Sequence, residues 1–212
     1  MPQKAIILCN GFPPLKSQLL EALTDSDLFI AADGGANIAK EFQLQPDVVI
    51  GDMDSFVETG EESFPVIEDP DQETNDLEKA LAYALEKNAT DVIVFGATGY
   101  RLDHTLKNLS VMKQFDSRFN TLLFRDRFAD IFLIQSPFSI ETPLHTTISL
   151  FPLSGRVEGI TTKGLKYNLN NGIMENGVRD GSSNLSIEKK IEIEFKKGDL
   201  LLFVNHKNIE TT

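Results

Sequence analysis

The 212-residue sequence contains no tryptophan and a single cysteine, Cys9. One cysteine cannot form an intrachain disulfide, and within an apolar segment it is expected to be a small buried hydrophobic residue. No apolar run approaches the roughly 18 residues of a membrane-spanning helix. The apolar part of the N-terminus, residues 5–9, is too short for a signal peptide and is expected to form a first strand. We therefore expect a cytoplasmic protein with no membrane partner.

Positive charge is scarce as well. The chain has 20 Lys and Arg residues against 32 Asp and Glu residues, which gives a formal net charge of −12. Such a chain repels polyanions, so nucleic acid is not expected as a partner. A nucleotide is still compatible if metal ions neutralise its phosphates, and the charge favours a cationic small molecule.

Two common nucleotide-binding signatures are missing. The sequence has no GxxxxGK[ST] loop. The turn Gly96-Ala97-Thr98-Gly99 suggests a dinucleotide motif, but the third glycine of GxGxxG would fall at Leu102. Without a P-loop lysine, a metal ion must carry more of the charge compensation for any bound phosphate.

The first two thirds of the chain alternate short apolar segments with helical patterns. Strands are expected at residues 5–9, 28–32, 48–50 and 91–95, and leucines recur at helical spacing between them. In the helix after Arg101, Leu102, Leu106 and Leu109 are expected to point inward.

Beyond about residue 139 the helical period gives way to short strand patterns, such as Ile191 and Ile193 alternating with glutamates. We predict an α/β N-terminal domain with a mostly parallel sheet, residues 1–138, followed by a small all-β sandwich domain, residues 139–212.

Two carboxylates follow the apolar segment 48–50. Asp52 and Asp54 stand two residues apart, so an extended chain places them on the same side. The carboxyl ends of strands bind ligands in open α/β sheets, and hard oxygen ligands suit Mg²⁺. Asp76 lies in the first turn of a helix that Thr74 or Asn75 can cap, with Glu78 placed as the capping-box partner of Asn75. It either complements the helix dipole or brings a third carboxylate to the same metal.

Two glycine turns are further candidates for phosphate binding. Gly34 and Gly35 follow Asp33 at a strand-to-helix turn, which is either a plain tight turn or a phosphate site. Gly99 precedes Arg101, and arginine is a natural partner for phosphate oxygens. His104, in the first turn of the next helix, is interpreted as a local hydrogen-bonding residue rather than a general base.

Taken together, these segments resemble the thiamin pyrophosphokinase family, in order and over nearly the whole chain. The matching pieces are Asp33-Gly34-Gly35-Ala36-Asn37, Gly51-Asp52-Met53-Asp54-Ser55, Asp71-Gln72 with Asn75-Asp76 and Lys79, Gly99 with Arg101-Leu102-Asp103-His104 and Asn108, Ser149-Leu150 with Pro152, Gly164-Leu165, and Ser183-Asn184. The resemblance implies a catalytic, nucleotide-binding α/β domain and a β-sandwich domain for thiamin binding and dimerisation, working as a homodimer.

The resemblance also implies an activity, namely transfer of pyrophosphate from ATP to the hydroxyethyl group of thiamin with Mg²⁺ as cofactor and AMP as the second product. The expected metal ligands are Asp52, Asp54 and Asp76, and Asp103 either completes the metal shell or orients the thiamin hydroxyl. The expected ATP-binding residues are Asp33, Gly34, Gly35, Asn75, Gly99, Arg101, His104 and Asn108. The expected thiamin-binding residues are Tyr167, Ser183 and Asn184.

Three positions depart from the family pattern. Asn75 stands where a threonine often precedes the acid, Tyr100 replaces a glycine, and Tyr167 replaces a tryptophan found in many members. Tyrosine stacks on an aromatic cation less strongly than tryptophan. These changes concern substrate affinity more than the reaction.

Two other functions fit parts of the sequence. An aspartyl-nucleophile phosphatase would use Asp52 as the phosphorylated residue and Asp54 as the proton donor. A non-enzymatic nucleotide or thiamin sensor would use the binding residues without turnover.

Overall fold

The computed structural model of the chain describes residues 3–57, 60 and 63–206. Contacts divide it into two compact units, residues 1–127 and 128–212. Within the described residues, no helix is both long enough and apolar enough to cross a membrane.

The first unit is an open parallel sheet with helices on both faces. Its strands are β1 (Gln3–Leu8), β2 (Leu28–Ala32), β3 (Val48–Gly51), β4 (Val66–Glu68), β5 (Ala89–Phe95) and β6 (Thr121–Arg125). Its helices are α1 (Lys16–Thr24), α2 (Gly35–Glu41), α3 (Asp76–Glu86), α4 (Leu102–Phe115) and the short 3-10 helix η1 (Asp116–Arg118). The strand order is β6-β5-β1-β2-β3-β4, and the neighbours in it pair in parallel.

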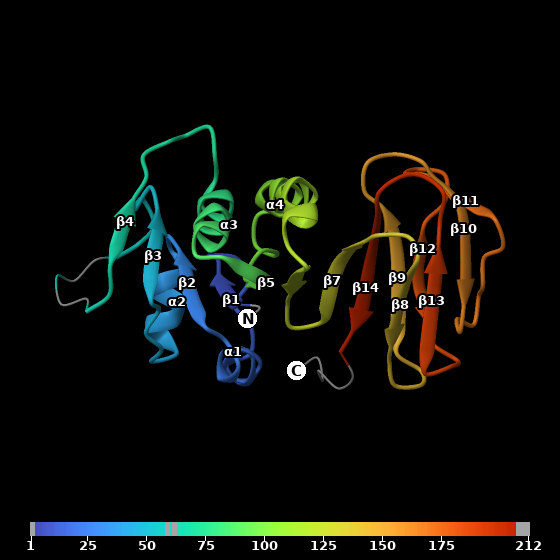
Figure 1. The fold of residues 1–212 in the computed structure, drawn as a ribbon, viewed down its shortest axis with the longest axis horizontal. Coiled ribbons are helices and arrows are strands. Elements are labelled where there is room, and N and C mark those ends of the chain that lie inside the picture. The colour runs from blue at the N-terminus through green and yellow to red at the C-terminus, as the bar shows by residue number, and fades with distance from the viewer. Residues whose placement is uncertain (1–2, 58–59, 61–62, 207–212) are drawn as a thin grey trace. The chain divides into compact units, whose positions relative to one another are not determined.

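This order reverses between β1 and β5, because the chain adds β2 and β3 on one side of β1 and β5 and β6 on the other. Figure 1 shows α1 and α2 on one side of the sheet and α3 and α4 on the opposite side. The crevice at such a reversal, beyond the carboxyl ends of the strands, is where open α/β sheets bind ligands.

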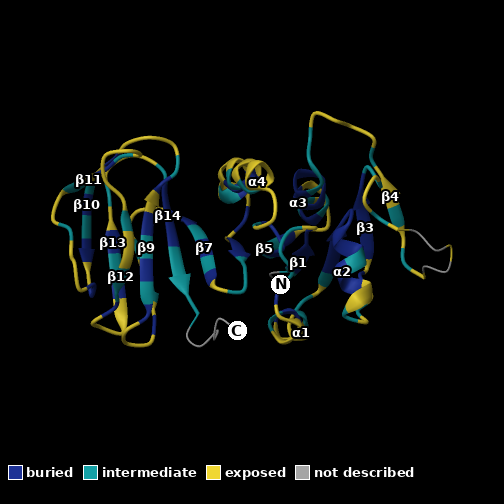
Figure 2. Ribbon diagram, turned by 180° about the vertical axis from the view of Figure 1, so that it is seen from behind, coloured by how far each residue is buried: buried dark blue, intermediate teal, exposed yellow. Residues whose placement is uncertain are grey.

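The central strands are apolar because both of their faces are covered by helices. Ile6 and Leu8 of β1 pack with Leu19 of α1 and Ile38 of α2. Figure 2 shows β1 and β3 among the buried segments. Cys9, which follows β1, is also buried, and burial raises the pKa of its thiol well above the usual range. It is a small buried residue, as predicted.

One expectation about α4 is wrong. Leu102 and Leu106 are 71% and 59% exposed, although their spacing predicted that they point inward. Leu109, the third leucine of the pattern, is half-buried. Figure 2 shows much of α4 as exposed. The side of α4 that faces the protein carries the buried residues Asn108, Val111, Met112 and Phe115. These recur at the i, i+3, i+4, i+7 spacing of a helix face, but the first of them is polar.

The second unit is a β-sandwich of two antiparallel sheets. Its strands are β7 (Ala129–Ile134), β8 (Phe138–Glu141), β9 (Thr147–Pro152), β10 (Val157–Lys163), β11 (Gly172–Met174), β12 (Gly181–Leu185), β13 (Lys190–Glu194) and β14 (Leu200–Asn205). One sheet has the order β12-β9-β14-β7 and the other the order β11-β10-β13-β8. Ile148 and Leu202 of the first sheet share a core with Ile160 and Ile193 of the second.

The predicted fold class is confirmed by an α/β unit followed by an antiparallel β unit. The contacts assign β7 to the second unit because it pairs with β14 along its whole length. The assignment of nucleotide binding to residues 1–138 and of thiamin binding to residues 139–212 remains a prediction.

Candidate active site

A cavity of about 680 Å³ lies in the first unit at the carboxyl ends of the strands. Its lining includes the residues that directly follow four strands: Cys9 after β1, Asp33 after β2, Asp52 after β3 and Gly96 after β5. The cavity therefore occupies the position that the reversal of strand order predicts for a ligand.

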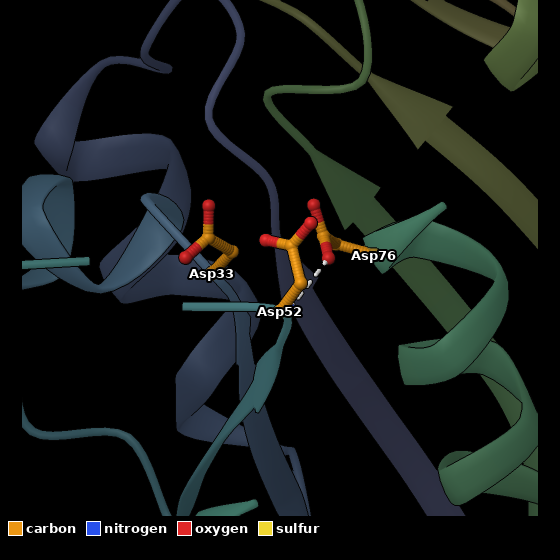
Figure 3. A group of neighbouring side chains, drawn as sticks. All are labelled: Asp33, Asp52 and Asp76. Carbon is orange, nitrogen blue, oxygen red and sulfur yellow. Dashed lines mark hydrogen bonds between the residues drawn. The ribbon is translucent and has the colours of Figure 1, made fainter. Parts of the chain in front are cut away.

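Three aspartates from separate segments converge in this cavity. Asp33, Asp52 and Asp76 each offer a carboxylate oxygen, and these oxygens lie within 4.8 Å of one another. Figure 3 shows the three side chains grouped together, with the backbone N–H of Asp52 donating to Oδ1 of Asp76 at 3.3 Å. Asp33 is buried, whereas Asp52 and Asp76 are half-buried.

The group is electrostatically unfavourable without a cation. Burial raises the pKa of Asp76 to about 6, and the charges of Asp33 and Asp52 add to this effect while Lys79 opposes it. Burial also raises the pKa of Asp33. A divalent cation among the three oxygens would offset this repulsion, and Mg²⁺ prefers such ligands. The residues present therefore fit a magnesium site.

Residues of the loop after β3 hold Asp33, and Gln72, which follows β4, holds Asp52. The carboxylate of Asp33 accepts hydrogen bonds from the backbone N–H of Ser55 at 3.2 Å and of Phe56 at 3.0 Å. The Gln72 side-chain amide donates to Asp52 Oδ2 at 3.2 Å. This bond, followed by one from the Asp54 N–H, lowers the pKa of Asp52.

A chain of amides connects the start of α3 to α4. The Asn75 side chain caps α3 by accepting from the Glu78 N–H at 3.0 Å, and its Nδ2 donates to Asn108 Oδ1 at 2.9 Å. Asn108 Nδ2 in turn donates to the Ala97 carbonyl at 2.8 Å. The carbonyl can only accept, so the direction of the whole chain is fixed. Asp76, which follows Asn75, is positioned by this link.

The other predicted catalytic acids lie outside the group of three. Asp54 lines the cavity, and its carboxylate accepts from the Ser55 hydroxyl at 2.7 Å. Asp103 is paired with Arg101 through two bonds, of 3.2 and 2.5 Å, and both side chains are exposed. The pair lowers the pKa of Asp103. The metal and catalytic roles of Asp54 and Asp103 remain predictions.

The predicted ATP-binding residues divide into two sets. Those that line the cavity are Asp33, Asn75, Gly99, Arg101, His104 and Asn108. Gly34 and Gly35 serve close packing, because a Cβ on Gly35 would lie 1.9 Å from the Leu8 carbonyl oxygen and one on Gly34 would lie 2.2 Å from Asn10 Nδ2. A nucleotide role for either set remains a prediction.

The predicted thiamin-binding residues lie in the second unit. Tyr167 and Asn184 help to line a smaller hollow of about 160 Å³, whereas Ser183 is not part of its lining. Asn184 accepts from the Tyr167 N–H at 3.0 Å and donates to its carbonyl at 2.8 Å. The Tyr167 ring is exposed, and Lys166 Nζ lies 5.3 Å from its centroid. The Ser183 N–H donates to Ser149 Oγ at 3.0 Å. Thiamin binding by these residues remains a prediction.

Sequence reasoning did not include Asp33 among the metal ligands, although a signal was present. Asp33 directly follows β2, just as Asp52 directly follows β3, and these strands are neighbours in the sheet. The strand order itself was not predicted, so their proximity was not recognised. Lys107, which also lines the cavity, was not singled out.

The fold and the site define a two-part protein, with an α/β unit whose ligand cavity lies at the carboxyl ends of its strands and a β-sandwich unit. Residues 19–124 match the family model "Thiamin pyrophosphokinase, catalytic domain", and residues 137–200 match "Thiamin pyrophosphokinase, vitamin B1 binding domain". The chain belongs to the thiamin pyrophosphokinase family and is an enzyme of that family.

Relatives match over most of their length. The chain is 31% identical to thiamine pyrophosphokinase 2 of Arabidopsis thaliana, covering 95% of this chain and 85% of the relative. It is 29% identical to thiamine pyrophosphokinase 1 of Oryza sativa subsp. japonica, with 96% and 88% covered. The crystal structure of thiamine pyrophosphokinase from Bacillus subtilis is similar with a TM-score of 0.84 and 26% identity, and 97% of this chain and 100% of that one are covered.

Proposed function

We propose that this enzyme transfers a pyrophosphoryl group from ATP to the hydroxyethyl group of thiamin. The thiamin hydroxyl oxygen forms a bond to the β-phosphorus, and the bond from that phosphorus to the oxygen bridging the α-phosphate breaks. AMP leaves with the electron pair, and the hydroxyl proton is released. The observation that carries the proposal is the convergence of Asp33, Asp52 and Asp76 at the strand ends of a chain in this family.

An acidic protein that binds the polyanionic triphosphate of ATP needs a cation to neutralise the phosphate charge, and the aspartates would hold that cation. When bound, Mg²⁺ would neutralise phosphate charge, held by Asp52, Asp54 and Asp76 together with Asp33. Catalysis of this kind relies mainly on positioning and electrostatics. Asp103 would complete the metal shell or orient the thiamin hydroxyl.

The remaining cavity residues would bind the nucleotide. Arg101 and His104 would donate to phosphate from their side chains. The Gly34–Gly35 and Gly96–Gly99 turns would contribute to nucleotide binding through their backbone. In the second unit, Tyr167, Ser183 and Asn184 would bind the aromatic rings of thiamin. A homodimer and a cytoplasmic location are part of the same proposal.

Product analysis tests the reaction. With Mg²⁺, ATP and thiamin, AMP is expected to form in step with thiamin diphosphate. Release of phosphate from monoesters without thiamin would instead support the aspartyl phosphatase, and binding of both substrates without turnover would support the sensor.

The variant Asp54→Ala tests the metal assignment. Because the Asp54 carboxylate bonds locally to Ser55, we expect the fold to survive, as measured by circular dichroism. Turnover should fall by about 10²-fold or more, since charge stabilisation around the phosphates is lost. Near-normal turnover would remove Asp54 from the proposed metal site.

A further inference from the structure

One face of α4 lines the cavity and carries a cation that the proposed mechanism does not use. His104, Lys107 and Asn108 all belong to the lining. Their i, i+3, i+4 spacing places them on the same side of the helix. Lys107 therefore presents a positive charge on a wall that it shares with Asn75 and Asp76.

Lys107 is held in place by a buried acid. Its Nζ lies 2.8 Å from Glu78 Oε2, and the side chain of Glu78 is 6% exposed while that of Lys107 is 46% exposed. Glu78 Oε2 also accepts from the Asn75 N–H at 2.9 Å. A lysine ammonium has three donors, and among the described residues Glu78 takes one of them. The remaining donors are available to a ligand in the cavity.

Arg101 also lines the cavity, and Lys79 lies close to its acids. The guanidinium of Arg101 forms two bonds to Asp103 and keeps three further N–H groups, which the proposed function directs at phosphate. Lys79 is buried, and its Nζ donates to the Asp69 carbonyl at 2.6 Å. A nucleoside polyphosphate carries several negative charges into a cavity that already holds carboxylates, so a fixed cation on its wall is favourable.

We propose that Lys107 is a phosphate-binding residue of this cavity, held in position by Glu78, and that its ligand is a nucleoside polyphosphate. The inference rests on the proposed use of ATP. The competing interpretation is that the Lys107–Glu78 pair only braces α3 against α4. A brace depends equally on both partners, whereas phosphate binding depends on the charge of Lys107.

Two binding measurements on the full chain distinguish phosphate binding from bracing. The ligands are Mg·ATP and adenosine, and affinities are measured by calorimetry and by competition. Lys107→Met is expected to weaken Mg·ATP by about tenfold or more, because a hydrogen bond to a charged group is lost. Adenosine, which has no phosphate, should bind within about twofold of wild type, since the lost interaction is with phosphate. Lys107→Arg keeps the charge and should recover most of the affinity.

Glu78→Gln is the matched control. Glutamine is also a capping-box partner, so the cap is kept and only the ion pair to Lys107 is lost. We expect it to weaken Mg·ATP less than Lys107→Met does, with similar unfolding midpoints for the two variants. Equal loss of affinity for Mg·ATP and adenosine in Lys107→Met, or no loss at all, would overturn the proposal.

The outcomes also separate this proposal from the reaction. If the wild type makes AMP and thiamin diphosphate while Lys107→Met binds Mg·ATP normally, the proposed role of Lys107 is wrong and the proposed reaction is supported. If Mg·ATP binding depends on Lys107 but no thiamin diphosphate forms, the proposed role of Lys107 is supported and the proposed reaction is wrong.

Discussion

At the scale of single residues, the carboxylate of Asp76 supplies negative charge to the site and, when ionised, lowers the stability of the folded state. It begins α3, where an acid complements the helix dipole. Burial and the neighbouring carboxylates nevertheless raise its pKa to about 6. A group whose pKa is raised on folding contributes stability below its unfolded pKa and loses that contribution as the pH rises through its folded pKa.

Asp76→Asn is therefore expected to gain stability relative to the wild type as the pH rises from about 4 to about 7 in metal-free buffer. Thermal unfolding with EDTA at both ends of this range measures the difference. Asp52→Asn is the control, because hydrogen bonds lower the pKa of Asp52 and no such gain is expected. An Asp76→Asn variant whose stability relative to wild type stays the same or falls between about pH 4 and about pH 7 would contradict this account.

The same residues show what could be predicted locally. Asp52 and Asp76 were both identified from their positions at a strand end and a helix start, and the structure brings their carboxylates together. Asp33 was recognised as a strand-end acid but not as their neighbour. Its proximity depends on the pairing of β2 with β3, a tertiary fact that local patterns do not contain.

At the scale of elements, α3 was predictable and the orientation of α4 was not. The capping box of Asn75 and Glu78 appears in the structure as expected. On α4, the leucine spacing indicated the wrong face. The buried face begins with the polar residue Asn108, which an apolar pattern does not reveal. An amide can be buried when its polar atoms are satisfied, and Asn75 and Ala97 satisfy those of Asn108.

Asn75→Ala is expected to reduce the free energy of unfolding by about 1–2 kcal/mol, since it removes the cap of α3 and the bond to Asn108. Urea unfolding measures the change. Asn75→Ser is the matched variant, because serine caps a helix well but is too short to replace the amide bond, and a smaller loss is expected. Equal stability of the alanine variant and wild type would show that the amide chain contributes nothing to folding.

At the scale of the whole molecule, the division into an α/β part and a β part followed from the change of period along the chain. The order of strands and the placement of the cavity did not, because they depend on which strands pair. The net charge of −12 is a property of the sequence alone. Its effect on substrates extends over about a Debye length, roughly 10 Å at 0.1 M salt.

This charge predicts opposite salt effects for the two proposed substrates. Mg·ATP is an anion and thiamin a cation, so the acidic protein repels the first and attracts the second. Raising NaCl from about 20 to about 200 mM screens both interactions. We expect kcat/KM for Mg·ATP to rise and kcat/KM for thiamin to fall, each by about twofold, in steady-state assays at fixed free Mg²⁺. A parallel fall for both substrates would mean that local contacts such as that of Lys107, rather than the overall charge, dominate the approach of the nucleotide.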